Sequence, residues 1–347
     1  MKLRVDILKN AANFRLDVQL EAEEGTVALL GASGSGKTLT LRCIAGLDTP
    51  DEGRVILDDE PLYDSSRHVN LTPQQRRIGL LVPGYALFPH LTVRQNISAS
   101  LENNRERERV AEEMIRRFRL SEVAERKPRQ LSELDRLRTA LARLTASRPA
   151  ALLLDEPLSM VDSFARFELE QELTAFLTAF QRPVIWASDD RGEVYRNCDS
   201  VCVLENGLSQ ELISAERLLN HPGTECAARL SGCKNIVSAI ARHNAVFIPE
   251  WGVTLRSSYP IPPLLHRVGI RAHQVHIAEP SLVNTFAVTV ERVIEDVSCT
   301  IVLLRPDGAD ESAPLLRMEL DRGLWRTTPN QRHLTVSVAP QDLLLLR

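Results

Sequence analysis

An apolar segment, a glycine-rich loop and a helical segment follow one another near the start of this chain, and they constrain its fold more than any other feature. Residues 26–30 read as a strand, and Gly46 can end the helix that follows the loop. The loop fits a phosphate-binding spacing of two glycines, a lysine and a hydroxyl residue. It comprises Gly31, Ala32, Ser33, Gly34, Ser35, Gly36, Lys37 and Thr38. Backbone N–H groups of such a loop turn inward around a phosphate, and the next helix adds its positive N-terminus.

Two side chains of this loop have distinct predicted roles. Lys37 would contact the β- and γ-phosphates, and the Thr38 hydroxyl would bind Mg²⁺. A flexible Gly-Ser linker could match the pattern by chance, but a linker would lack the strand before it and the helix after it. The sequence therefore predicts a site for a nucleoside triphosphate with Mg²⁺.

Composition is that of an ordinary enzyme and gives no sign of nucleic acid as a partner. The 347 residues predict two or three domains, each able to bury a core. Lys and Arg number 42 against 46 Asp and Glu, a net charge of −4.

No apolar run approaches the roughly 18 residues of a membrane-spanning helix, and the first residues lack the apolar region of a signal peptide. Any membrane role is therefore expected to come through a partner.

The pattern of apolar residues changes twice along the chain. Residues 92–147 carry apolar side chains at helical spacing, whereas residues 150–154 and 184–188 read as short buried strands. Such alternation predicts an α/β fold with a parallel sheet. After about residue 232 the segments become short and β-rich, which predicts a separate small barrel or sandwich. Arg76 and Arg77 are expected on a solvated helix face.

A second motif, ALLLDEP at 151–157, supplies two carboxylates at the end of an apolar strand. Parallel sheets bind ligands at the carboxyl ends of their strands. Asp155 would hold the Mg²⁺ bound by Thr38, and Glu156 would act as the catalytic general base on an attacking water. An apolar strand that ends in Asp-Glu is unremarkable alone, so the functional interpretation depends on the phosphate-binding loop upstream.

The order of these motifs resembles that of ATP-binding cassette (ABC) transporter ATPases over about residues 1–230. After the phosphate-binding loop, the segments that carry the resemblance are RRIGLLVPGYALFPHLTVRQNI (76–97), LSELDRLRTALAR (131–143), LLLDEPLSMVD (152–162) and VIWASDD (184–190). The chain looks most like the ATPase subunit of molybdate-type oxyanion importers, on the basis of LFPHLTVRQNI (87–97), the short lead-in before the loop, and GCKNI (232–236) and GIRAHQV (269–275) in the β-rich tail. Ferric-iron, sulfate and polyamine importers share many of these sequence motifs.

The resemblance implies an architecture and a set of partners. We expect an ABC ATP-binding domain over residues 1–231, with a helical subdomain at about 92–147, and a β-rich regulatory or oxyanion-binding-like domain over 232–347. ATP and Mg²⁺ are the implied cofactors. The implied partners are a transmembrane permease, a second ABC subunit (identical or different) and, indirectly, a solute-binding protein. Such a subunit would lie at the cytoplasmic face of the membrane, held there by the permease.

The chain departs from the family at its signature motif. Members of the family place an LSGGQ segment of one subunit against the ATP of the other. Here the segment is Leu131-Ser132-Glu133-Leu134-Asp135, without either glycine or the glutamine. Glycine lets a backbone approach phosphate closely, whereas Glu133 and Asp135 add negative charge. Ser132 and Asp135 also fit a capping box, so a well-capped helix is favoured over an active signature.

Two further positions depart from the family pattern. The glutamine that the family uses to sense Mg²⁺ and the attacking water aligns with Pro83, which has neither a side-chain amide nor a backbone N–H. The family's switch histidine aligns with Asp189, and an ionised aspartate cannot donate a proton to a phosphate. The aspartate of the family's D-loop is retained as Asp162.

Two functional hypotheses remain open at this point. In the first, the chain is a working ATPase that powers import of molybdate or a related oxyanion. In the second, it binds nucleotide but hydrolyses it poorly, and serves as a silent or regulatory subunit beside a competent one. Asp155 and Glu156 favour the first, whereas Pro83, Glu133 and Asp189 favour the second. An unrelated P-loop kinase or GTPase is disfavoured by the motif order.

Overall fold

The chain forms two compact units, Met1–Ala215 and Glu216–Arg347. A computed structural model describes residues 1–11, 14–101, 104–278, 283–327 and 332–347. The second unit begins before residue 232 because helix α9 (Glu225–Leu230) packs on it: Ala228 clusters with Leu344 and Leu346. The expected domain boundary at 231 stays a prediction.

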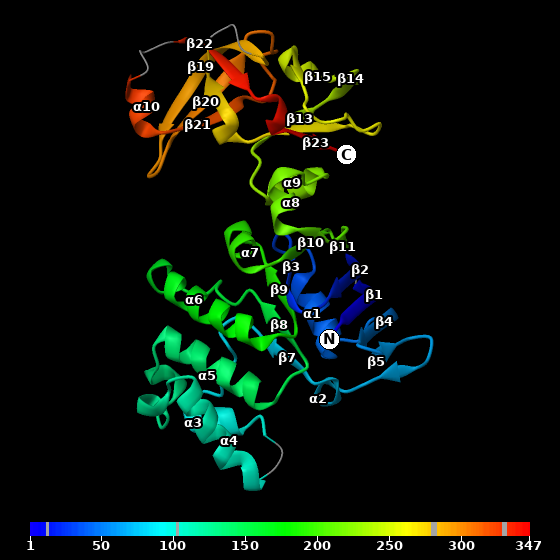
Figure 1. Ribbon diagram of the computed structural model, residues 1–347, viewed down its shortest axis with the longest axis vertical. Helices are drawn as coiled ribbons and strands as arrows, with labels where there is room; N and C mark the ends of the chain where they lie inside the picture. The colour runs from blue at the N-terminus through cyan, green and yellow to red at the C-terminus, as the bar shows by residue number, and fades with distance from the viewer. Residues whose placement is uncertain (12–13, 102–103, 279–282, 328–331) are drawn as a thin grey trace. The chain divides into compact units, whose positions relative to one another are not determined.

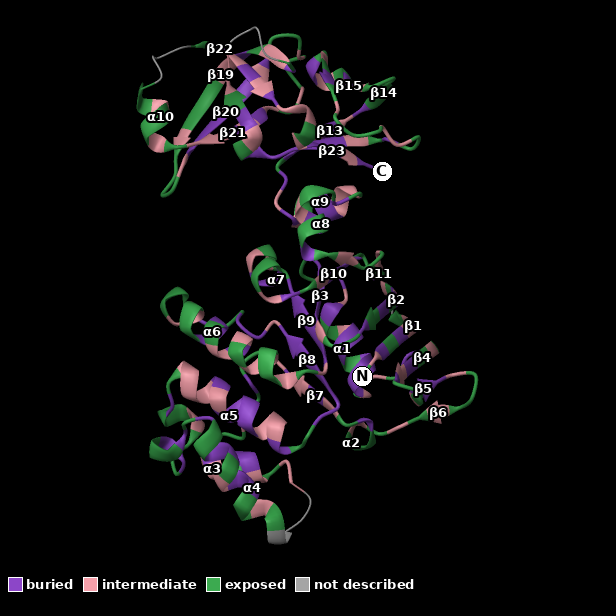
Figure 2. Cartoon of the chain, in the orientation of Figure 1, coloured by how far each residue is buried: buried purple, intermediate pink, exposed green. Residues whose placement is uncertain are grey.

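A mixed sheet is the framework of the first unit (Figure 1). Among the described residues its strand order is β6-β5-β4-β1-β2-β11-β10-β3-β9-β8-β7, with β12 beside β10. The strands are β1 (Leu3–Ala11), β2 (Phe14–Ala22), β3 (Gly25–Leu30), β4 (Glu52–Leu57), β5 (Glu60–Asp64), β6 (Val69–Asn70), β7 (Ile78–Leu81), β8 (Ala151–Asp155), β9 (Pro183–Ser188), β10 (Ser200–Glu205), β11 (Leu208–Ser209) and β12 (Ile213–Ser214). Strands β10, β3, β9, β8 and β7 are parallel, as predicted, and β3, β8 and β9 are buried along almost their whole length (Figure 2).

Helices pack on the parallel strands and also form a separate cluster. The helices of this unit are α1 (Lys37–Ala45), α2 (Pro73–Arg76), α3 (Val93–Ser98), α4 (Asn104–Arg117), α5 (Glu133–Ala146), α6 (Ser163–Phe180) and α7 (Arg191–Asn197). Helix α1 packs against β7, β8 and β9, whereas α7 packs against β3 and β9. Helices α3, α4 and α5 pack on one another at one end of the unit, within the segment expected to be helical (Figure 1).

The expectation that Arg76 is solvated is wrong. Its side chain is 1% exposed, and it donates to Cys43 O and Ile44 O at 2.8 Å each, at the C-terminal end of α1. It also donates to Leu71 O at 3.0 Å and to Asn70 Oδ1 at 2.9 Å. Arg76 therefore donates to the last carbonyls of α1, where a cation is favoured by the helix dipole, and burial lowers its pKa.

The second unit is β-rich, as predicted. Its strands are β13 (Asn235–Ser238), β14 (Ile240–Arg242), β15 (Ala245–Ile248), β16 (Val253–Arg256), β17 (Arg267–Ile270), β18 (Val275–Ile277), β19 (Thr285–Glu295), β20 (Thr300–Pro306), β21 (Leu316–Leu320), β22 (His333–Val338) and β23 (Leu343–Leu346). They form sheets in the orders β13-β17-β23, β14-β15-β16 and β18-β22-β19-β20-β21 around one apolar core. Helices α8 (Ala215–Asn220), α9 and α10 (Arg322–Thr327) complete the secondary structure.

In the part of the chain that the structure describes, no helix combines the length and the apolar character needed to cross a membrane.

Candidate functional site

The phosphate-binding loop and the Asp155-Glu156 pair meet at the carboxyl ends of three neighbouring strands, β3, β9 and β8. In the β3–β9 register Leu30 lies opposite Ser188, and in the β8–β9 register Asp155 lies opposite Ala187. The backbone N–H of Gly31 donates to Ser188 O at 3.3 Å. The phosphate-binding loop after β3 and the carboxylates after β8 are thus brought together across β9.

The loop has the backbone geometry that its glycines permit. Gly34 and Gly36 have φ of 80° and 109°, in the left-handed region where a β-carbon is strained. At Gly31, an added β-carbon would lie 2.4 Å from Ser35 Oγ and 2.6 Å from Leu204 O. Helix α1 begins at Lys37, directly after Gly36, so the last two residues of the loop lie in its first turn. The loop therefore has the tight turn and helix N-terminus that were expected of an anion site.

The side chain of Lys37 is buried and reaches back from the end of this loop to its first residues. Its side chain is 4% exposed, and Nζ donates to Gly31 O at 2.9 Å and to Ala32 O at 3.2 Å. The same nitrogen lies 3.3 Å from Glu156 Oε1. A buried ammonium group is stabilised by such carbonyl and carboxylate partners, and here they hold it at the centre of the loop.

Thr38 and Asp155, the two residues expected to bind Mg²⁺, contact each other. Thr38 Oγ1 donates to Asp155 Oδ1 at 3.1 Å. Burial raises the pKa of Asp155, against a smaller opposite effect of the Thr38 hydrogen bond. No described group of three or more His, Cys, Asp or Glu side chains could hold a metal alone. Mg²⁺ commonly uses one or two carboxylates together with waters and substrate phosphates, so one hydroxyl and one carboxylate fit that ion.

Glu156 adopts a strained backbone conformation beside Lys37. Its φ is 44°, although it is not glycine, and its N–H donates to Ala187 O at 2.9 Å. Such left-handed residues cost on the order of 1–3 kcal/mol and cluster at functional sites. The side chain of Glu156 is 30% exposed, which leaves it accessible to water. The geometry is compatible with a general base.

The signature position forms a helix start capped by Ser132, as predicted, but the Asp135 carboxylate accepts from the Ser132 hydroxyl and not from the Ser132 backbone N–H that a capping box would use. Ser132 is the N-cap of α5, and its hydroxyl accepts from Asp135 N at 3.1 Å while donating to Asp135 Oδ2 at 2.8 Å. Glu133 forms an ion pair with Arg136 at 2.6 Å, within the same helix, and Leu134 is half-buried. The polar groups of this segment therefore bind one another.

Pro83 lies in a tight turn. Tyr85 N donates to Val82 O at 3.0 Å, and Gly84 has a φ of 67°, which is the arrangement of Pro and Gly in a type II turn. Arg143 of α5 donates to Tyr85 O at 2.9 Å and so ties the turn to this helix. The Pro-Gly pair indicates such a turn in the sequence, but no sequence signal identified Arg143 as its partner.

Asp189 and Asp162 lie at the ends of neighbouring elements. Asp189 is exposed and follows β9 directly. Asp162 is the N-cap of α6 and accepts from Phe164 N at 2.9 Å and from Ala165 N at 3.0 Å. Two charged residues that sequence analysis missed, Arg166 and Glu193, join α6 to α7 beside Asp189.

Comparisons with known proteins relate the chain to one family. A family model described as ABC transporter matches residues 15–159. The molybdenum import ATP-binding protein ModC of Paramagnetospirillum magneticum is 32% identical over 286 residues, which cover 80% of this chain and 78% of that protein. The sulfate/thiosulfate import ATP-binding protein CysA of Synechocystis sp. is 37% identical over 64% of this chain and 62% of its own length. A bacterial ABC transporter cassette, solved as a dimer, matches 62% of this chain and 99% of its own, with a TM-score of 0.51 and 26% identity.

Proposed function

We propose that this chain, which belongs to the ABC transporter ATPase family, is the ATP-binding subunit of an importer for molybdate or a related oxyanion. Nucleotide binding is supported mainly by one observation: Lys37 lies buried within the loop, and Thr38 of the same loop contacts Asp155. The oxyanion assignment is supported by two relatives, one a molybdenum import protein and the other a sulfate/thiosulfate import protein. Ferric iron and polyamines remain alternative solutes.

The residues of the loop and of the Asp155-Glu156 pair would have separate roles in binding and hydrolysing ATP. Backbone N–H groups of residues 31–38 would bind the β- and γ-phosphates, and Lys37 would exchange its contact with Glu156 for phosphate oxygens. Thr38 and Asp155 would hold Mg²⁺, which when bound neutralises phosphate charge. Glu156 would take a proton from water, whose oxygen attacks the γ-phosphorus as the bond to the ADP oxygen breaks.

A second candidate function, nucleotide binding with slow hydrolysis, is favoured by the three altered positions. Pro83 lies in a turn and offers no amide to position water. The N-terminus of α5 is already capped by the Ser132 hydroxyl, which accepts from Asp135 N and donates to the Asp135 carboxylate. Asp189 would place a carboxylate near the γ-phosphate, where a like charge raises the energy of the transition state. In this role the chain would regulate, or pair with, a competent second ABC subunit.

The proposed subunit would act with a transmembrane permease at the cytoplasmic face of the membrane, and indirectly with a solute-binding protein. The β-rich second unit would mediate dimer contacts or sense the anion. The test is uptake of radiolabelled molybdate by cells that lack this chain, complemented with the native chain or with Lys37→Ala. We expect only the native chain to restore uptake. Unchanged molybdate uptake together with loss of sulfate, iron or polyamine uptake would overturn the solute assignment and keep the importer role.

A further inference from the structure

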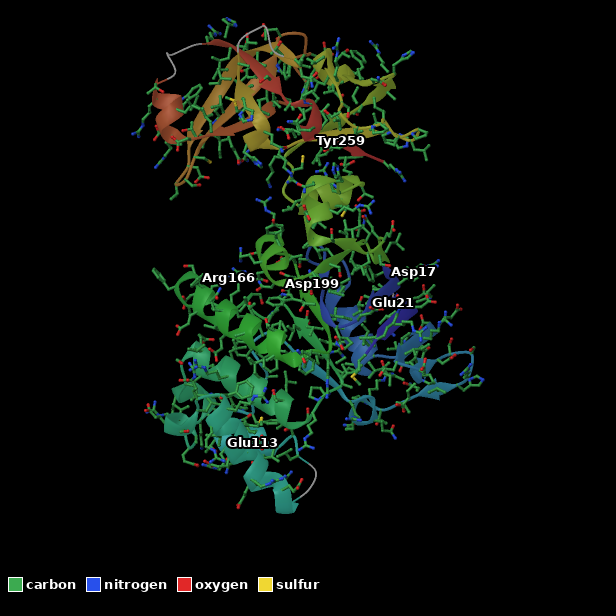
Figure 3. The ribbon with its side chains drawn as sticks, viewed as in Figure 1. Asp17, Glu21, Glu113, Arg166, Asp199 and Tyr259 are labelled. Atoms are coloured by element: carbon green, nitrogen blue, oxygen red, sulfur yellow. The ribbon has the colours of Figure 1, made fainter. Side chains whose placement is uncertain are left out.

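A network of charged side chains joins α6 to α7 at the carboxyl end of β9. Arg166, in the first turn of α6, projects toward α7 (Figure 3). One of its guanidinium nitrogens, Nη2, donates to Asp190 Oδ2 at 3.1 Å and also to Glu193 Oε1. These hydrogen bonds connect the helix that follows Asp162 with the segment that follows Asp189.

The network extends inward to the end of β9. Glu193 is 2% exposed, and its second oxygen, Oε2, accepts from Ser188 Oγ at 2.8 Å. The Ser188 hydroxyl in turn accepts from Asp190 N at 3.0 Å, and Ser188 O accepts from Gly31 N at 3.3 Å. A buried carboxylate is stable only when its oxygens are bonded, so the Arg166–Glu193 pair imposes one arrangement on Ser188.

We infer that Arg166 is a positioning residue that, through Glu193 and Asp190, sets the distance of the Asp189 carboxylate from the phosphate-binding loop. Asp189 lies between Ser188 and Asp190, and both of these neighbours are held by the network. The inference rests on the proposed function, because Asp189 acts on bound nucleotide only if the loop binds it. Arg166 itself touches none of the reacting atoms.

A second charged layer between the same helices provides a matched control. About one helical turn further along, Glu170 accepts from Arg196 Nε at 2.7 Å and from Asn197 Nδ2 at 2.7 Å. Glu170 is 5% exposed, so its carboxylate is buried like that of Glu193, although Arg196 is more exposed than Arg166. It joins α6 to α7 without the hydrogen bonds to Asp190 and Ser188 that distinguish the Arg166 layer.

The test is a double-mutant cycle read as the affinity of a fluorescent ATP analogue with Mg²⁺. In the native background, Asp189→Asn removes a negative charge and should tighten binding about threefold to tenfold. In an Arg166→Met, Glu193→Gln background this gain should fall below about twofold, because Asp189 is no longer held in place. Removing both charges together leaves no unpaired buried charge. In a Glu170→Gln, Arg196→Met background the full gain should remain.

Each outcome supports or overturns a stated claim. If Asp189→Asn tightens nucleotide binding equally in the native and Arg166 backgrounds, Arg166 does not position Asp189. If the gain is lost in the Glu170 background as well, the effect comes from the general packing of α6 on α7 and not from the Arg166 layer. If Asp189→Asn changes nothing in a native chain that binds nucleotide, the placement of Asp189 beside the phosphate is wrong. No binding by the native chain overturns the proposed function itself. If the Arg166 background does not fold, Ser188→Ala, which keeps the ion pair and removes the hydroxyl, should reduce the gain equally.

Discussion

The two halves of the candidate site differ in where their polar groups find partners. Around the phosphate-binding loop, Lys37 is buried, the loop needs left-handed glycines, and Glu156 is strained. Around the altered positions, Ser132 caps a helix and Pro83 completes a turn. The first half keeps arrangements that cost stability and suit an anion, whereas Ser132, Glu133 and Asp135 of the second half bond to one another or to the next turn of the same helix. A strained loop suited to an anion and a locally satisfied helix start therefore occur in one domain.

The largest effect is expected from rebuilding the second half. The substitutions Pro83→Gln, Glu133→Gly, Leu134→Gly, Asp135→Gln and Asp189→His together should raise steady-state phosphate release at least about a hundredfold, because each 1.4 kcal/mol of regained transition-state stabilisation is tenfold in rate. Adding Glu156→Gln should abolish that gain. If the unmodified chain already releases phosphate rapidly, and does so only with Glu156 present, the altered positions of the second half do not slow hydrolysis.

A smaller effect is expected from removing the central cation of the first half. Lys37→Ala should weaken binding of a fluorescent ATP analogue about tenfold to a hundredfold, as expected for a charge-assisted hydrogen bond of about 1.5–3 kcal/mol. Equilibrium titration measures the affinity. Lys234→Ala, at an exposed lysine of the second unit, is the control and should bind as the native chain does. Equal affinities of the Lys37→Ala and native chains would refute the phosphate-binding role.

The helix cap should contribute stability in the second half. Ser132→Ala removes the acceptor of the Asp135 N–H, so it should lower the free energy of unfolding by about 1 kcal/mol. Urea unfolding followed by circular dichroism measures this change. Ser147→Ala, at the exposed opposite end of α5, should have less effect. If the two variants are equally stable, the cap does not stabilise the altered signature.

The smallest effect concerns the buried carboxylate of the first half. Because burial raises the pKa of Asp155, the folded chain holds its proton to a higher pH than the unfolded chain does. Stability therefore falls as pH rises from the ordinary value of about 3.9 through the raised folded pKa. Asp155→Asn should accordingly be slightly more stable than the native chain at about pH 7 and equally stable at about pH 3. Urea unfolding at both pH values measures this, and a native chain that is more stable at neutral pH contradicts it.

Local patterns allowed the fold class and the clustering of the first half to be predicted. The loop, its strand and its helix are contiguous, and Asp155 follows an unbroken apolar strand, so spacing alone predicts that they meet at one sheet edge. The capping of α5 is equally local, because Ser132 and Asp135 are three residues apart.

Long-range charged contacts could not be predicted in the same way. Arg76 reads as a surface arginine, yet it binds carbonyls of α1 that lie 32 and 33 residues earlier. Arg166 and Glu193 are 27 residues apart on two helices, and only the packing of those helices brings them together. The placement of α9 in the second unit likewise depends on distant residues, because Ala228 clusters with Leu344 and Leu346.

The ion pair between Lys37 and Glu156 makes nucleotide entry an exchange of counterions. An arriving phosphate competes with a tethered carboxylate for one ammonium group, so part of its attraction is used to displace that carboxylate. Glu156 would be released from Lys37 only when a phosphate occupies the loop. Its availability to activate water would then depend on the presence of the molecule to be cleaved.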